Sequence, residues 1–199
     1  MYRPSARFKR TAEERRDQLL SWEREDVAFF AAGACHILAY AFMETYPEAG
    51  FHAVGLWSRG AQDPGHVYVT DGTWAFDHDG WTPEPELLSV TRATTPDADF
   101  RTGPVHGDLD AFCTRHHHRP RRLFAFDPWE RALRYLRQFP PPGRVTGESV
   151  STPRRPESIG NPPPTPLPCR PLDTVTGGYK DLVHDDGAGP LAAPAPLPP

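Results

Sequence analysis

The sequence predicts an α+β domain in which a helix that carries a cysteine packs on a small antiparallel sheet, followed by a disordered, proline-rich C-terminal tail. An uncharged apolar run at residues 27–43 is long enough for a buried helix. Two short segments of strand-forming residues flank Asp71-Gly72, which is typical of a two-residue hairpin turn. Sixteen of the 25 prolines lie in residues 140–199, which hold one of the 22 aromatic residues. Such a segment buries too little apolar surface to offset the entropy that folding costs.

Length and composition set the domain organisation. A chain of 199 residues suits one domain with an appendage. We expect residues 1–10 to form a flexible N-terminus, residues 11–139 to fold as the α+β domain, and residues 140–199 to form the tail. The net charge of −4 argues against a globally basic nucleic-acid binder, and three scattered cysteines are too few for a disulfide framework. Acidic residues before the apolar run are wrong for a signal peptide, so we expect a cytoplasmic protein with no membrane partner.

Two helices are predicted before the first strand. Residues 11–14 fit a capping box, which indicates a short polar helix over residues 12–22. The next helix contains the apolar run, and its starting point decides the setting of Cys35. If Asp26 caps this helix, Cys35 lies in the middle; if Gly33 caps it, Cys35 lies in the first turn.

The strands follow this helix. Residues 51–57 predict one strand, and residues 66–70 and 73–77 predict a hairpin closed by the turn at Asp71-Gly72. With a two-residue loop, His66 lies directly opposite Asp77 on the same face of the sheet.

The rest of the domain is predicted as mostly helical or irregular. Residues 82–88 indicate a capped helical turn, and residues 89–107 are expected to be mostly loop. Residues 108–116 predict a helix, and residues 123–126 are a candidate strand. An aspartate cap followed by proline predicts a last helix over residues 128–139.

Cys35, His66 and Asp77 are the residue types that thiol catalysis requires. A carboxylate opposite a histidine orients the imidazole and stabilises its protonated form. A thiol in the first turn of a helix lies at the positive end of the helix dipole, and a nearby imidazolium lowers its pKa further. Asp79 shares the face of Asp77 and is an alternative third member. The alternatives to a catalytic site are that Cys35 is a buried structural residue and that His66 and Asp77 form an exposed cross-strand pair.

The alternation along the hairpin raises a question about packing. Val67 and Val69 belong to its more apolar face, whereas His66 and Asp77 lie on the other. For the three residues to meet, we expect the Cys35 helix to cover the face of His66 and Asp77. The helix of residues 128–139 would then cover the apolar face.

The order of these residues resembles the papain-like fold in its transglutaminase-like and arylamine N-acetyltransferase-like branches. In those families a cysteine at a helix start is followed by a histidine that leads a hydrophobic strand, and an aspartate lies on the returning strand. The resemblance covers residues 25–80 and implies a papain-like fold. It implies Cys35 as the nucleophile, His66 as the general base and Asp77 as the orienting acid. No tryptophan or glutamine before Cys35 offers an obvious oxyanion donor, which leaves backbone N–H groups at the helix start.

These residues predict a thiol-dependent acyl-transfer enzyme that uses no cofactor and no metal. Amide or ester hydrolysis, transamidation and deamidation share this chemistry, with a peptide, a protein or a small acyl compound as substrate. An alternative is an inactive papain-like binding module that recruits partner proteins through the proline-rich tail.

A second cluster, residues 113–122, is rich in arginine and histidine. It predicts a patch for phosphate or nucleic acid, although a solvated basic helix end is an equally simple explanation. Cys113 and His116 have the spacing of two zinc ligands, but no second pair accompanies them. The residues that would bind an anion are Arg115, Arg119, Arg121 and Arg122.

Overall fold

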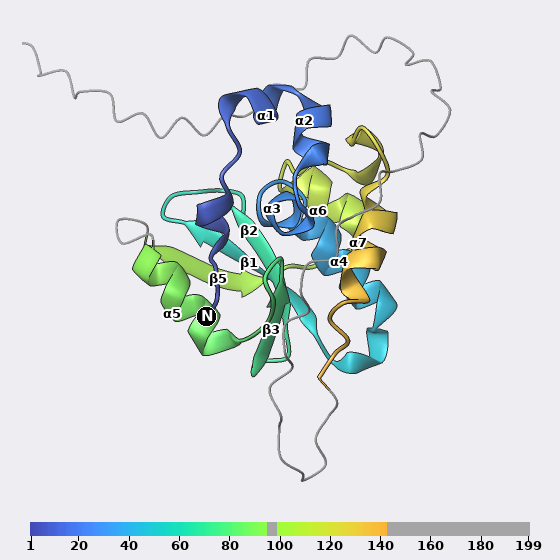
Figure 1. The fold of residues 1–199 in the computed structure, drawn as a ribbon. Coiled ribbons are helices and arrows are strands. Elements are labelled where there is room, and N and C mark those ends of the chain that lie inside the picture. Colours follow the sequence, from blue (N-terminus) through green and yellow to red (C-terminus); the bar gives the residue numbers. More distant parts are fainter. Residues whose placement is uncertain (95–98, 143–199) are drawn as a thin grey trace, which may run out of the picture. The chain divides into compact units, whose positions relative to one another are not determined.

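A five-stranded antiparallel sheet lies at the centre of the protein, in the strand order β4-β3-β2-β1-β5 (Figure 1). The structure, a computed structural model, describes residues 1–94 and 99–142. The strands are β1 (His52–Ser58), β2 (His66–Thr70), β3 (Trp74–Asp77), β4 (Gly80–Pro83) and β5 (Phe100–Pro104). The predicted α+β class is confirmed. The proline-rich tail was predicted for residues 140–199, and all of these except 140–142 lie outside the described residues.

Helices surround this sheet. The α-helices are α1 (Ala12–Arg16), α2 (Gln18–Glu23), α3 (Asp26–Ala31), α4 (Cys35–Thr45), α5 (Glu84–Thr94), α6 (Leu109–Arg115) and α7 (Pro128–Leu136). Short 3₁₀ helices are η1 (Ser5–Phe8), η2 (Pro47–Ala49) and η3 (Arg121–Leu123). Along residues 1–94 and 99–142, no helix has both the length and the apolar character needed to cross a membrane.

Side-chain caps begin several of these helices where the sequence predicts them. The capping box of Thr11 and Glu14 is present at α1. The predicted helix of residues 12–22 is divided, because the Asp17 carboxylate accepts two backbone N–H groups and starts α2. Asp108 caps α6 and Asp127 caps α7 in the same way.

The apolar run folds as two helices, α3 and α4, rather than one. The break falls at residues 32–34, where Gly33 has a φ of +124°, a value that side chains other than hydrogen disfavour. Cys35 is therefore the first residue of α4, in the first turn as the second of the two predicted possibilities has it, although the cap is Ala34 and not Gly33.

The hairpin of β2 and β3 forms in a different register from the predicted one. Thr70 pairs with Ala75, which displaces β3 by two residues. The cause is the Asp71 side chain, whose Oδ1 accepts the N–H groups of both Thr73 and Trp74 at 2.8 Å and moves the turn forward along the chain. A shift of two residues preserves the face of every side chain, so His66 and Asp77 remain on one side as diagonal neighbours.

Both faces of the sheet are buried, and α4 covers the face opposite to the predicted one. α4 packs on Val67, Val69 and Phe76, and the ring of Phe42 stacks on Phe76 with 5.2 Å between centroids. α7 packs against α4 on the same side, while α5 and the N-terminal segment cover the side of Tyr68 (Figure 1). The apolar face attracts the apolar helix because their contact removes the largest area from water.

Two predictions for the later segments are wrong, and a third is right in part. The helical turn predicted over residues 82–88 is the start of α5, which begins at Glu84 directly after β4. Residues 89–107, predicted as mostly loop, contain the rest of α5 and all of β5. β5 has no alternating pattern, and it forms because β1 offers an unpaired edge for it. Residues 123–126 form no strand, because Phe124 and Phe126 pack on the rings of Phe29 and Trp22 instead.

The first ten residues pack on the domain, in contrast to the flexible N-terminus that the sequence predicts. Tyr2 is 4% exposed, and Arg3 donates to Asp79 from its backbone N–H and from Nε, at 2.8 and 2.7 Å. These bonds attach the N-terminal segment to the chain immediately after β3. Their ion pairs and the burial of one aromatic ring offset the ordering entropy of this short segment.

Candidate functional site

Cys35 occupies the amino-terminal end of α4. The preceding residue, Ala34, has no side-chain acceptor, so no cap satisfies the N–H groups of the first turn. These N–H groups and the helix dipole favour negative charge at the Cys35 sulfur. The Cys35 side chain itself is buried, with 5% of the residue exposed.

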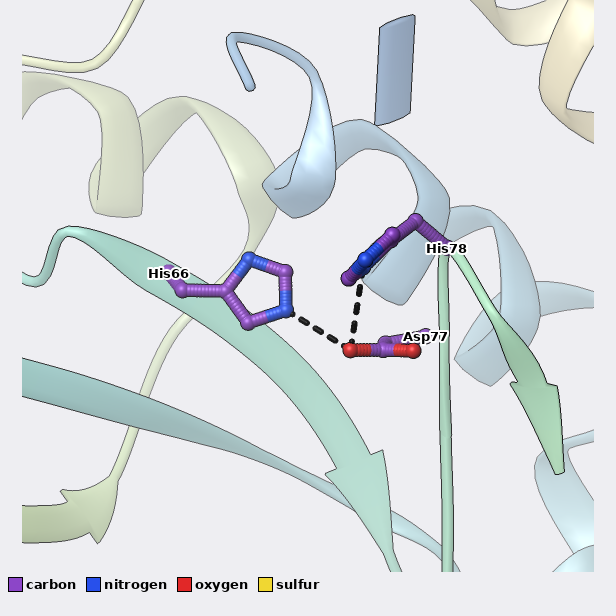
Figure 2. A group of neighbouring side chains, drawn as sticks. All are labelled: His66, Asp77 and His78. Atoms are coloured by element: carbon purple, nitrogen blue, oxygen red, sulfur yellow. Dashed lines mark hydrogen bonds and ion pairs between the residues drawn. The ribbon is translucent and has the colours of Figure 1, made fainter. Parts of the chain in front are cut away.

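His66 and Asp77 form a buried hydrogen-bonded pair at the diverging ends of β2 and β3. His66 Nε2 lies 2.9 Å from Asp77 Oδ2 (Figure 2). The residues are 3% and 2% exposed, respectively. Because Nε2 is used by Asp77, the other ring nitrogen, Nδ1, remains for Cys35, and it has no hydrogen-bond partner of good geometry among the described groups.

Electrostatics favour a thiolate and an imidazolium at this site. Burial raises the pKa of the Cys35 thiol, but the neighbouring imidazoles of His36 and His66 outweigh it and hold that pKa well below its ordinary value. Burial lowers the pKa of His66, but the hydrogen bond to Asp77 and the nearby thiol of Cys35 reverse this and raise it to about 10. Both shifts indicate that Cys35 and His66 lie in the same part of the fold, although no hydrogen bond joins them among the described residues.

Asp77 is held from several directions. Its Oδ2 accepts the Tyr2 hydroxyl at 2.8 Å and lies 3.1 Å from His78 Nδ1, and its Oδ1 accepts the N–H of Asp79 at 2.9 Å. Burial raises the pKa of Asp77, but the neighbouring His78 and His66 hold it far below the usual range. The carboxylate is therefore charged and fixed in orientation.

Asp79, the alternative third member, does not face His66. Both of its carboxylate oxygens bind Arg3: Oδ1 accepts the Nε–H at 2.7 Å and forms an ion pair with Nη2 at 2.6 Å, and Oδ2 accepts the backbone N–H. Asp77 is the carboxylate that the fold places on the histidine.

A second buried imidazole, His36, directly follows Cys35 in α4. It is 1% exposed, and its Nε2 lies 2.9 Å from the carbonyl oxygen of Arg119. Burial lowers the pKa of His36, but the neighbouring thiols of Cys113 and Cys35 raise it to about 9. His36 therefore adds a second stabilising group to a Cys35 thiolate.

The arginine cluster does not converge on one anion site. Arg121 forms a two-fold ion pair with Asp127, which neutralises its charge, and the Arg119 guanidinium lies over the Phe124 ring at 5.4 Å. Arg115 and Arg122 are exposed. Cys113, the potential zinc ligand of this segment, is buried and donates to the Arg119 carbonyl.

No family model, no curated protein and no solved structure matches the chain. The grouping of Cys35, His66 and Asp77 therefore has to be interpreted from its own geometry and chemistry.

Sequence reasoning missed three residues of this site, namely Tyr2, His36 and His78. Tyr2 lies 75 residues from Asp77 along the chain, and no local pattern signals such a contact. His36 and His78 each adjoin a predicted site residue, but their neighbours in sequence carry no information on which way their rings point. Burial of three histidines, each 1–3% exposed, is the unusual property that only the fold reveals.

Proposed function

We propose that this chain is a thiol-dependent acyl-transfer enzyme of the papain-like type, with Cys35 as nucleophile, His66 as general base and acid, and Asp77 as the group that orients His66. The observation that supports this most directly is the buried hydrogen bond between His66 and Asp77, together with the position of Cys35 as the first residue of a helix. The lowered pKa of Cys35 and the raised pKa of His66 support the pairing of this thiol with this imidazole.

The reaction follows from this arrangement. The Cys35 thiolate attacks the carbonyl carbon of an amide or ester, and the carbonyl electrons move to its oxygen. The uncapped N–H groups at the start of α4 are the donors placed to stabilise that oxyanion. As the oxyanion collapses, the bond to the leaving group breaks and His66 supplies a proton to it, which leaves a thioester on Cys35. His66 then removes a proton from water or an amine, which attacks the thioester and restores the thiol site.

The acceptor in the second step determines the class of reaction. Water gives hydrolysis or, with a side-chain amide as substrate, deamidation; an amine gives transamidation. We propose a peptide, a protein or a small acyl compound as substrate, since the three residues act on the acyl carbon whatever it is attached to.

Acetylation by p-nitrophenyl acetate tests the proposal. The full-length chain should release p-nitrophenol in an initial burst, and peptide mapping by mass spectrometry should locate one acetyl group on Cys35. Cys35→Ala should abolish the burst, whereas Cys113→Ala, the matched change at the other buried cysteine of the described residues, should retain it. Acetylation at Cys113 alone, or an unchanged burst in Cys35→Ala, would refute the proposal.

One observation favours the second candidate, an inactive papain-like binding module. Cys35 is 5% exposed, and a hollow beside Gly33 is lined by residues such as Trp22, Phe29 and Phe124 and not by Cys35 itself. A thiol that no acyl compound reaches would leave the chain without acetylation at Cys35 until it is unfolded. Equal acetylation of native and unfolded protein at neutral pH would argue for the enzyme.

A further inference from the structure

His78 is a buried histidine that the acyl-transfer mechanism does not use. Its ring lies beside that of His66, with centroids 5.2 Å apart and the planes at 87°, and both rings approach the same oxygen of Asp77 (Figure 2). One histidine on a carboxylate suffices for a catalytic pair. A second imidazole on the same oxygen therefore needs a separate explanation.

The hydrogen bonds of His78 do not explain the contact between its Nδ1 and Asp77. Its Nε2 lies 2.9 Å from the carbonyl oxygen of Arg3, which only accepts, so Nε2 carries a hydrogen. In the neutral ring Nδ1 then holds a lone pair, yet it lies 3.1 Å from Asp77 Oδ2, another acceptor. A cation, which is either a proton or a metal ion, has to lie near both atoms for this contact to be favourable.

The direction of Nδ1 favours a metal ion over a proton. A bridging proton lies on the line between nitrogen and oxygen, whereas a metal bonded to both lies beside that line. His78 Nδ1 is fully buried and makes no hydrogen bond of acceptable geometry within the described part of the chain, so it does not point at Oδ2. This is the orientation expected of a nitrogen that shares a cation with the carboxylate.

The dimensions of the cluster also suit a metal. His66, Asp77 and His78 each offer one atom, and all three atoms lie within 4.8 Å of one another. In a tetrahedral zinc site with bonds of about 2.1 Å, neighbouring ligand atoms are about 3.4 Å apart. The observed 2.9 and 3.1 Å separations from Asp77 Oδ2 need to change by only a few tenths of an ångström. Two imidazoles and one carboxylate form a ligand set that suits Zn²⁺.

We propose that His66 Nε2, Asp77 Oδ2 and His78 Nδ1 form a binding site for a zinc-like divalent cation, and that occupancy of this site switches off the thiol chemistry of Cys35. Binding replaces the proton on His66 Nε2, which is released to solvent. His66 then no longer cycles between its charged and neutral forms, and so it serves neither as acid nor as base. The binding site stands without the proposed function; the inhibition rests on it.

Zinc affinity of the full-length chain tests the binding site. Competition with a chromophoric chelator should reveal one tight site, weakened at least tenfold by His78→Gln, whose amide can still donate to the Arg3 carbonyl. Asp77→Asn should weaken it as well, and circular dichroism should show that both variants fold. The matched control is His117→Gln, because the exposed His117 and the partly buried His116 both lie beside Asp63 and form the competing site near the surface. Equal affinity in wild type and His78→Gln, or a loss confined to His117→Gln, would overturn the proposal.

A second measurement separates this inference from the proposed function. Cys35→Ala should keep the zinc affinity of the wild type, because the sulfur is not among the three ligands. Zinc should slow acetylation of Cys35 in the wild type and not in His78→Gln. If acetylation fails and zinc still binds through His78, the binding site holds and the acyl-transfer proposal fails; if acetylation proceeds equally with and without zinc at saturating concentration, the regulatory proposal fails.

Discussion

Replacing Asp77 by asparagine isolates the contribution of the buried carboxylate to the reactivity of Cys35. The change keeps the size of the side chain and removes its charge, while His66 Nε2 retains an oxygen acceptor at the 2.9 Å position. A hydrogen bond to a charged partner contributes about 1.5–3 kcal/mol. At about 1.4 kcal/mol for each pKa unit, the pKa of His66 should fall by roughly one to two units. Transfer of the proton from Cys35 to His66 then becomes about 10- to 100-fold less favourable.

The rate of alkylation of Cys35 by iodoacetamide, measured against pH and normalised to its value at high pH, reports this change. In the wild type the reaction should persist well below the ordinary thiol pKa of about 8.5. In Asp77→Asn the profile should move to higher pH by roughly one to two units. Asp79→Asn is the matched control, since the same change there removes a partner of Arg3 and not of His66. A folded Asp77→Asn with the wild-type profile, or an equal shift in Asp79→Asn, would refute the reasoning.

Three further predictions concern stability. Tyr2→Phe removes a buried hydrogen bond to a charged carboxylate and keeps the ring, so urea unfolding should show a loss of about 1.5–3 kcal/mol; an unchanged midpoint would mean that the bond is absent in solution. Gly80→Ala should destabilise by about 1–3 kcal/mol in the same assay, because φ is +85° and the added Cβ would lie 2.6 Å from Phe139; wild-type stability would contradict this geometry. The depressed pKa of Asp77 stabilises the fold above the ordinary carboxyl pKa of about 3.9, and this contribution disappears as the pH falls. Stability measured between pH 6 and 3 should therefore decline less in Asp77→Asn than in the wild type, and parallel declines would exclude this role.

Much of the site was accessible from the sequence because its determinants are local. Gly33 marks the break that starts a helix at Cys35. Side chains alternate between the two faces along a strand, so a register shift of two residues leaves His66 and Asp77 on the same face. The register itself was wrong because a single carboxylate, that of Asp71, bonds two N–H groups ahead of it and moves the turn. Such a side-chain bond competes with the preference of the Asp-Gly pair, and the sequence does not tell which one dominates.

The sequence did not predict correctly which helix covers which face of the sheet. The alternation of Val67 and Val69 correctly indicates an apolar face, but the assignment of α4 to the opposite face followed from the need to bring Cys35 to His66. In the structure α4 packs on the apolar face of Val67 and Val69, and the pairing of β2 with β3 is limited to Val69–Phe76 and Thr70–Ala75. Tyr2 and His78 depend on contacts between distant segments, for which no local pattern exists.

The last helix also has a consequence for how the chain matures. The Tyr135 hydroxyl of α7 donates to the His78 carbonyl, and Arg131 binds Asp26 and the backbone carbonyls of Trp22 and Arg24 at the end of α2. The segment that ends in Cys35 and the segment that presents His78 are therefore joined by residues synthesised about 50 to 100 positions later. A nascent chain that stops before α7 carries every group of the site without the scaffold that fixes them. Under the proposed function, the reactivity of Cys35 should therefore arise late in synthesis, after α7 has left the ribosome.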